Sequence, residues 1–476
     1  MEKSKFLKIV VVLILSALAW FAPTDFGMAG LTVIEQRVIA LFVFAAFMWI
    51  LEAIPIWTTS VSVIVLMIMM VSDSMLAPLN SADTNELFGT PISYKAIMGT
   101  FADPIVMLFM GGFALAIGAT KVGLDINLAR VMLKPFGTRS TIVLLGFMIV
   151  TAIFSMFMSN TATAAMMLAI VAPVLRQMPE DGKGRTALAL CIPVAANVGG
   201  IGTPIGTPPN AIALRYIQES GLDVHIGFGQ WMAVMVPFVL VMMTFAWFLL
   251  VKMYPFSQKH FVFHLDGKFR SDWRSIVVYL TFALTIVLWL LDTKTGMNSN
   301  SIAMIPLAIF CVTGIIGKEE LKSINWDVLW LVAGGFALGV GLQKSGLAKH
   351  IIDTIPFGDW APLAVLAGSG LICYVMSTFM SHSASSALLV PILATVAVGM
   401  GDSLNSFGGI STMLVGVAVS SSLAMALPIS TPPNALAHAT GMVEQRDMIR
   451  TGLIIGVVGI VLGYLFIYAG TQIGLL

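Results

Sequence analysis

Long apolar stretches, many of them near 20 residues, recur along the whole chain and are separated by short polar segments. An α-helix needs about 20 residues to cross a hydrocarbon core that is about 30 Å thick. Charged residues make up 10% of the 476 residues, whereas a soluble globular domain carries about 25%. The alternating segments of about ten residues that are typical of an outer-membrane barrel do not occur in this sequence. The sequence therefore predicts an all-α membrane protein and excludes a soluble enzyme.

We expect eleven transmembrane helices and two re-entrant hairpins. The hairpins are the apolar segments 141–175 and 362–398, which are too long for one span and carry a polar break in the middle. With the N-terminus in the cytoplasm and the C-terminus outside, 19 of the 25 lysines and arginines lie on the cytoplasmic side, as the positive-inside rule requires. The expected spans are residues 6–23, 31–51, 56–72, 103–120, 186–217, 230–251, 275–291, 301–317, 326–343, 408–440 and 452–471.

Three sequence blocks occur twice, at an offset of 222 to 224 residues. They are GGFAL at 111–115 and 334–338, FMSNTA at 157–162 with FMSHSA at 379–384, and PIGTPPNAIA at 204–213 with PISTPPNALA at 428–437. The expected topology puts five crossings between the two GGFAL copies, so the two halves have opposite orientations in the membrane. A channel could also carry a repeat, but inverted repeats favour an alternating-access carrier that binds its substrate near the bilayer midplane.

Polar residues interrupt the apolar segments at four places. Two are the hairpin tips at 159–161 and 381–383, and two are the Thr-Pro-Pro-Asn motifs at 207–210 and 431–434. Paired prolines stop a helix, and the freed carbonyls and new helix N-termini can then bind a cation and an anion. A single motif of this kind could be a kink with a capping residue. Two copies at matching positions favour a binding site.

The expected site is neutral, because no acidic or basic residue except Arg215 lies near the four breaks. A multivalent anion that is held by neutral groups in a low-dielectric environment needs a countercharge. Co-bound sodium ions would supply this charge through the oxygens of the same loops. The absence of nearby carboxylates argues against a proton relay that is built on Asp or Glu.

With these paired motifs and Glu-Ala-Ile-Pro at 52–55, the sequence resembles the divalent anion/sodium symporter family over essentially its whole length. The resemblance implies a transporter of the bacterial inner membrane that imports C4-dicarboxylates (succinate, malate or fumarate) together with sodium ions. It also implies a homodimer, in which transport domains move as elevators against scaffold domains. The corresponding parts of this chain are scaffold helices at 1–102 and 230–325, transport-domain halves at 103–229 and 326–445, and a last helix at 446–476.

The same resemblance implies the site residues. The first sodium site would comprise Ser155, Ser159, Asn160 and the Gly206 carbonyl, and the second would comprise Ser377, His382 and the Ser430 region. The residues implied to contact the substrate are Asn160, Thr161, Thr207, Pro208, His382, Ser383, Thr431 and Pro432. No catalytic residue and no nucleic-acid partner are expected.

His382 is a departure from the family pattern, because the related symporters usually carry Ser-Asn-Thr where this chain has Ser-His-Ser. A neutral imidazole nitrogen is a poor ligand for a hard cation, whereas a protonated imidazole would itself be a countercharge. His382 could also merely form a hydrogen bond across the tip. A sodium-independent dicarboxylate exchanger therefore stays open as an alternative, as does a sodium-coupled citrate or sulfate transporter. No HExxH motif, phosphate loop or nucleophile–base pair is found, so an enzyme is not expected.

Overall fold

The computed structural model describes residues 3–23, 30–80, 87–176, 178, 182–222, 224–260 and 269–476. Over these residues the chain forms 23 α-helices and four short 3-10 helices, and no β-strand. Ten helical segments in this part of the chain are long and apolar enough to cross a membrane, and four shorter apolar helices accompany them. The prediction of an all-α membrane protein is therefore confirmed.

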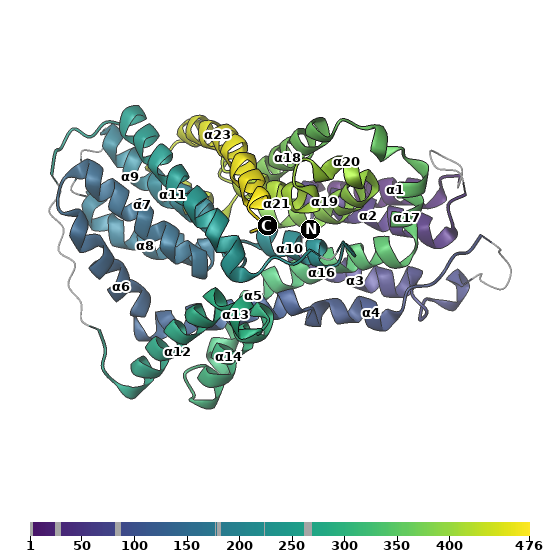
Figure 1. The fold of residues 1–476 in the computed structure, drawn as a ribbon, viewed down its shortest axis with the longest axis horizontal. Coiled ribbons are helices and arrows are strands. Elements are labelled where there is room, and N and C mark those ends of the chain that lie inside the picture. The colour runs from purple at the N-terminus through teal and green to yellow at the C-terminus, as the bar shows by residue number, and fades with distance from the viewer. Residues whose placement is uncertain are drawn as a thin grey trace.

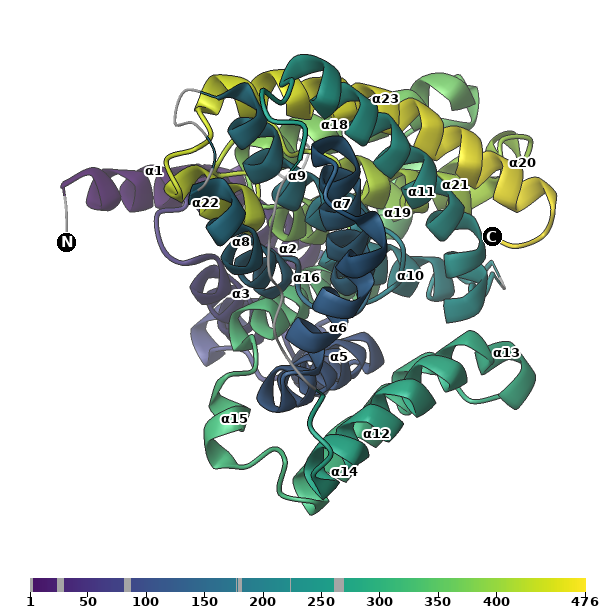
Figure 2. The ribbon, with the colours of Figure 1, turned by 90° about the vertical axis from the view of Figure 1, so that its left-hand side faces the viewer.

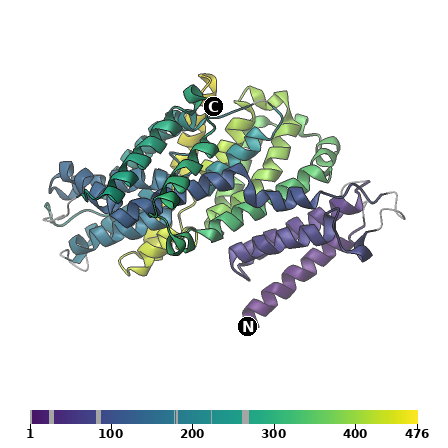
Figure 3. The ribbon, with the colours of Figure 1, turned by 90° about the horizontal axis from the view of Figure 1, so that it is seen from below.

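The N-terminal helices are α1 (Lys3–Phe21), α2 (Val33–Leu51), α3 (Ile56–Val71) and α4 (Tyr94–Gly99). Helix α1 lies along the edge of the molecule (Figure 3) and exposes most of its apolar side chains, as a helix in contact with lipid does. Thr32 begins α2 with a capping box, because its hydroxyl accepts from the Glu35 amide at 3.2 Å. Glu52 ends α2 in the left-handed region at φ 45°, and Pro55 precedes α3.

Two series of seven helices follow each other in the same order and carry the two copies of the repeated blocks. Figure 1 shows most of the first series on one side of the molecule and most of the second on the other. The first series is α5 (Pro104–Val122), α6 (Leu124–Leu133), α7 (Ser140–Phe157), α8 (Asn160–Arg176), α9 (Lys183–Gly200), α10 (Pro208–Gln218) and α11 (Phe228–Met253). The second is α16 (Trp326–Lys344), α17 (Leu347–Thr354), α18 (Pro362–Phe379), α19 (His382–Met400), α21 (Gly409–Ser422), α22 (Pro432–Ala439) and α23 (Gln445–Gln472), with the short α20 (Asp402–Asn405) between α19 and α21.

The GGFAL blocks pack the first helix of each series closely against a neighbour. Between the two series in the sequence come α12 (Trp273–Leu290), α13 (Asp292–Thr295), α14 (Ser299–Val312) and α15 (Lys318–Lys322), which lie toward the lower edge of Figure 2. Helix α14 packs along α5. A Cβ on Gly111 would stand 2.0 Å from the Ala303 carbonyl oxygen of α14, and one on Gly334 of α16 would stand 2.4 Å from the Ser60 Cβ of α3. Small residues allow this approach in membrane helices, so α5 with α14 and α16 with α3 form matching pairs.

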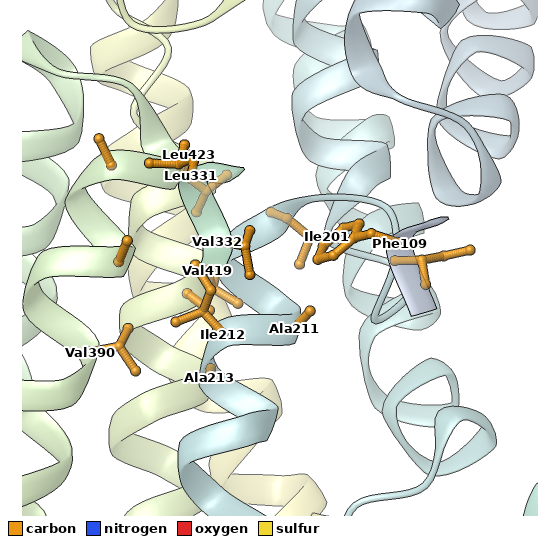
Figure 4. Packing of buried hydrophobic residues seen from close by; sticks show 14 of the residues in the cluster. Phe109, Ile201, Ala211, Ile212, Ala213, Leu331, Val332, Val390, Val419 and Leu423 are labelled. Carbon is orange, nitrogen blue, oxygen red and sulfur yellow. The ribbon is translucent and has the colours of Figure 1, made fainter. Parts of the chain in front are cut away.

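The two series interlock through the short helices that follow the proline pairs. Helix α10 leaves the first series and packs against α19 and α21 of the second, while α22 packs against α8 and α9 of the first. In Figure 4, Ile212 and Ala213 of α10 lie among Val332, Val390 and Val419 of the second series. Because each series supplies a helix to the core of the other, the breaks that precede α10 and α22 lie in the middle of the molecule.

Candidate functional site

Both hairpin tips and both Thr-Pro-Pro-Asn breaks line one cavity of about 870 Å³. Of the thirteen predicted site residues, eleven line this cavity. The other two, Ser155 and Ser377, are completely buried. The structure therefore brings together residues from four segments that are distant in sequence.

The two tips have matching backbones, which explains why the same residue types recur there. Met158 (φ −125°, ψ 161°) and Met380 (φ −121°, ψ 176°) are both extended and separate the two helices of each hairpin. Ser159 and Ser381 then cap the second helix, because their hydroxyls accept from the Ala162 and Ala384 amides, each at 3.2 Å. The hydroxyl of Ser159, a predicted sodium ligand, thus has a capping role.

The two Thr-Pro-Pro-Asn motifs also have matching backbones. Thr207 (φ −149°, ψ 142°) and Thr431 (φ −146°, ψ 147°) are extended residues that precede a Pro-Pro pair in the first turn of a helix. The asparagine at the end of each motif satisfies the carbonyls that the break leaves unpaired. The Asn210 Nδ2 donates to the Gly200 and Thr203 carbonyls at 3.0 and 2.8 Å, and the Asn434 Nδ2 donates to the Met425 and Leu427 carbonyls at 2.7 and 3.0 Å.

Oxygen atoms converge beneath the first tip. The Ser155 hydroxyl lies 2.5 Å from the Asn160 Oδ1 and 2.7 Å from the Ala196 carbonyl oxygen, although it has one proton to donate. Glycines allow the tip to approach the break, since a Cβ on Gly200 would stand 2.8 Å from the Asn160 Oδ1 and 3.0 Å from the Gly206 carbonyl oxygen. Neutral hydroxyl, amide and carbonyl oxygens are suitable ligands for a hard cation such as sodium.

The second tip differs at the corresponding place. The His382 Nε2 lies 2.7 Å from the carbonyl oxygen of Ala424, the counterpart of Gly200, and must donate its proton to that acceptor. The Ser377 hydroxyl lies 2.8 Å from the Ser421 hydroxyl, which donates to the His382 carbonyl at 3.0 Å. The Ser430 hydroxyl donates to the Thr378 carbonyl at 2.6 Å. At the predicted second sodium site, the Ala424 carbonyl oxygen therefore accepts a hydrogen bond from the His382 imidazole.

The cavity runs from the breaks along α5 to a charged mouth. Among the described residues, Lys121, Glu320 and Asp327 are the charged residues that line it. The Lys121 ammonium donates to the Glu320 carboxylate and lowers the pKa of Glu320 to about 2, with a further contribution from the Gly317 amide. The end of the cavity near the breaks is thus neutral, as predicted, and the fixed charges stand at its opening.

Sequence reasoning missed two further features of this region. The Arg215 Nε forms a buried ion pair with the Asp103 carboxylate at 2.7 Å, and its guanidinium stands 4.0 Å from the Phe336 ring of α16. Asn197 of α9 lines the cavity and donates to residues of the second Thr-Pro-Pro-Asn motif. Neither contact has a local signal, because the partners are more than 100 residues apart.

Comparison with known proteins gives the family. The family model described as citrate transporter matches residues 46–408 of the chain. The chain belongs to the citrate transporter family. This membership confirms the resemblance to divalent anion/sodium symporters and makes the chain a membrane transport protein rather than an enzyme.

Related sequences agree with this assignment, and a solved structure has a similar fold. The chain is 28% identical to proteins named sodium-dependent dicarboxylate transporter SdcS from Staphylococcus aureus strains USA300 and NCTC 8325 / PS 47, over 96% of this chain and 89% of each relative. Its fold is similar to that of the Alcanivorax borkumensis YdaH transporter, with a TM-score of 0.53 and 14% identity over 80% of this chain and 88% of that one. The second comparison supports the fold alone.

Proposed function

We propose that this member of the family is a secondary active transporter that imports C4-dicarboxylates such as succinate, malate and fumarate together with sodium ions. The observation that carries the proposal is the convergence of four polar breaks on one cavity whose inner end is neutral. Thr207 and Thr431 offer hydroxyls there, and the N-termini of α8 and α19 at the two tips offer backbone amides, which are suitable partners for carboxylates. The printed names of the 28% identical relatives support the same substrate class.

Sodium is proposed to bind at the first tip. The Ser155 hydroxyl, the Asn160 Oδ1 and the Gly206 carbonyl form the oxygen cluster described above. A cation in this cluster would supply the countercharge that a dianion needs in a neutral site.

The second tip favours transport that is not coupled to sodium, because the His382 imidazole donates a hydrogen bond to the Ala424 carbonyl oxygen. A dicarboxylate exchanger without sodium is therefore the second candidate function. A sodium-coupled citrate or sulfate transporter is a third, and the family description supports citrate.

We propose that transport occurs by alternating access of two inverted halves, with the cavity open to the cytoplasm in this conformation. Lys121 at the cavity mouth belongs to the side that the positive-inside rule assigns to the cytoplasm. Helix α16 packs along α19, whereas the cavity lies between their counterparts α5 and α8. Exchange of these two arrangements would move the opening to the other side.

The moving part would be the hairpins and broken helices of both halves, in an elevator motion within a homodimer. We place α5 and α16 with the scaffold rather than with the transport domain, because they pack closely along α14 and α3. The N-terminus is proposed to lie in the cytoplasm and the C-terminus outside.

Uptake of labelled succinate into proteoliposomes tests this function. We expect uptake that is driven by an inward sodium gradient and not by an equal potassium gradient. Asn160→Ala should abolish uptake, because it removes an oxygen of the proposed sodium site. Asn405→Ala, at an exposed position of α20, should leave uptake unchanged. Uptake that needs internal dicarboxylate and ignores sodium would establish the exchanger. Uptake of citrate or sulfate in place of succinate would establish the third candidate function.

A further inference from the structure

A hydrogen-bond relay crosses from the first series of helices to the substrate-binding threonine of the second. The relay starts at Asn434, whose amide orientation is determined by two carbonyl acceptors. The Asn434 Nδ2 lies 2.7 Å from the Met425 carbonyl oxygen and 3.0 Å from the Leu427 carbonyl oxygen. Since a carbonyl oxygen can only accept, the atom facing both must be the NH₂ group. The Asn434 Oδ1 is consequently the atom that faces Asn197.

The orientation of Asn434 determines that of Asn197. The Asn197 side-chain nitrogen lies 3.1 Å from the Asn434 Oδ1 and 3.2 Å from the Thr431 Oγ1. Its two protons serve these two acceptors. Asn197 is 1% exposed and Asn434 is 2% exposed, so water does not compete for these bonds. The Asn197 amide is therefore held by a chain of contacts that ends on backbone carbonyls.

The relay leaves the Thr431 hydroxyl one remaining role. Its oxygen accepts from the Asn197 Nδ2 at 3.2 Å and from the Asn434 backbone amide at 3.3 Å. A hydroxyl has two acceptor lone pairs and one proton, so its proton is what Thr431 can still offer. Thr431 lines the cavity, where a carboxylate can accept that proton in a charge-assisted hydrogen bond.

We infer that Asn197 is a positioning residue that makes the Thr431 hydroxyl a dedicated hydrogen-bond donor to a substrate carboxylate. This inference rests on the proposed dicarboxylate function. Its energetic basis is preorganisation: the hydroxyl already points its proton toward the anion before the anion arrives. A hydroxyl that could rotate freely would also present lone pairs, which repel a carboxylate.

The repeat supplies an internal comparison, because the first half lacks this device. Thr207 is the counterpart of Thr431, and its side chain does not cap the following helix. Ser421 is the counterpart of Asn197, and its hydroxyl donates to the His382 carbonyl at 3.0 Å. The two threonines are thus equivalent in sequence but differ in how their hydroxyls are held, and Thr431 is the one that depends on Asn197.

A double-mutant cycle on the full-length chain in proteoliposomes tests the inference. Thr431→Val should raise the KM for succinate about tenfold, as expected for the loss of a hydrogen bond to a charged group. Asn197→Leu should raise it by a smaller factor, and the variant with both changes should be no worse than Thr431→Val alone. Thr207→Val provides the matched control, since its effect should multiply with that of Asn197→Leu. Thr431→Ser should retain most of the affinity.

Each outcome decides the matter. Multiplication of the Asn197→Leu and Thr431→Val effects, or an unchanged KM in Asn197→Leu, would overturn the inference and leave the proposed function standing. Wild-type protein that neither binds nor transports any dicarboxylate would overturn both. If Asn197→Leu fails to insert, Asn197→Ser, which carries the residue of the other half, takes its place in the cycle. Failure of both variants to insert would make Asn197 a folding residue and would also overturn the inference.

Discussion

Asn160 and His382 occupy matching positions in the two tips that line the cavity, and they differ in chemistry. Asn160 brings an amide oxygen to the Ser155 hydroxyl and the Gly206 carbonyl, while His382 at the matching position donates an N–H to the Ala424 carbonyl. A carbonyl that accepts a strong hydrogen bond is less available to a cation, and an imidazole N–H cannot ligate one. The first half is therefore suited to sodium, and the second is suited to holding its tip without sodium.

His382→Asn should make transport more strongly dependent on sodium. The change restores an amide oxygen at the second tip and releases the Ala424 carbonyl, so a second cation could bind there. We expect a steeper dependence of succinate uptake on sodium concentration, with a higher Hill coefficient than in the wild-type protein. Ser383→Thr, a conservative change at the next residue, should leave the steepness unchanged. Superimposable sodium curves for His382→Asn and the wild-type protein would show that His382 serves only to hold the tip.

At the scale of the helical element, the break between α9 and α10 depends on two glycines that approach each other. A Cβ on Gly206 would stand 2.3 Å from the Gly200 carbonyl oxygen, a contact that the backbone would have to open to relieve. Asn210 draws the same carbonyl inward with its hydrogen bond. The close approach and the proline pair together give the break its shape.

Gly206→Ala should abolish transport while the protein still inserts, because the displaced backbone would move the Gly206 carbonyl and the Thr207 hydroxyl away from the tip. The matched control is Gly112→Ala in α5, where the added Cβ would meet the Ile205 Cδ1 at an ordinary 3.6 Å. Alanine is also the better helix former by about 1 kcal/mol. Gly112→Ala should therefore transport normally, and succinate uptake by equal amounts of inserted protein compares the two variants. Normal uptake by Gly206→Ala would contradict the proposed role of the break.

The sequence predicts the helix breaks, because a proline interrupts a helix whatever its tertiary contacts are. It also predicts that the four breaks form one site, because the repeated blocks recur in the same order. Pro208 and Pro209 lack two amide donors in any fold, so the interruption of the helix is predicted from the sequence alone. The Asn197 relay and the Arg215–Asp103 pair could not be predicted, since each depends on which helices pack together. An asparagine such as Asn197 in an apolar segment could form hydrogen bonds with many partners. The packing of α22 against α9 determines that its partners are Thr431 and Asn434.

At the scale of the whole molecule, the proposed alternating access depends on the proposed inversion of the two halves. The loop that precedes α7 and the loop that precedes α18 occupy the same place in the repeat. Thr138 and Trp360 are counterparts there, at an offset of 222 residues, and both are exposed. Parallel halves would put the two loops on one side of the membrane, and inverted halves would put them on opposite sides.

A cysteine at Thr138 should therefore react with an impermeant maleimide only from the cytoplasmic side, and one at Trp360 only from outside. The experiment needs Cys311→Ser in the background, because Cys311 is exposed, whereas Cys191 and Cys373 are buried. Labelling in intact cells and in inside-out vesicles gives the comparison. Reaction of both cysteines from the same side would exclude inverted halves and the mechanism that depends on them.

The buried pair of Arg215 and Asp103 lies at the end of α5 that is far from the charged mouth. Their side chains are 7% and 10% exposed, and the pair joins α10 to the first residues of α5. Arg215 also stands over Phe336 of α16, so it links three helices. Under the proposed motion α10 moves and α5 does not, so the pair must break whenever the cavity opens on the other side.

Arg215→Gln and Asp103→Asn should each shift the molecule toward the opposite opening. Arg215→Gln leaves the buried Asp103 carboxylate without its partner, which costs about 3–5 kcal/mol in such pairs. Asp103→Asn costs less, because Arg215 keeps the exposed Glu219 carboxylate at 3.3 Å. A cysteine at Ala162, an exposed residue of the cavity wall, reports the shift: in a Cys311→Ser background it should react from outside faster in either variant than with the pair intact. The double variant keeps two amides and no lone charge, so its melting temperature should fall by less than the sum of the two single decreases. Additive decreases and an unchanged rate of outside labelling would show that the pair does not hold this end of the cavity closed.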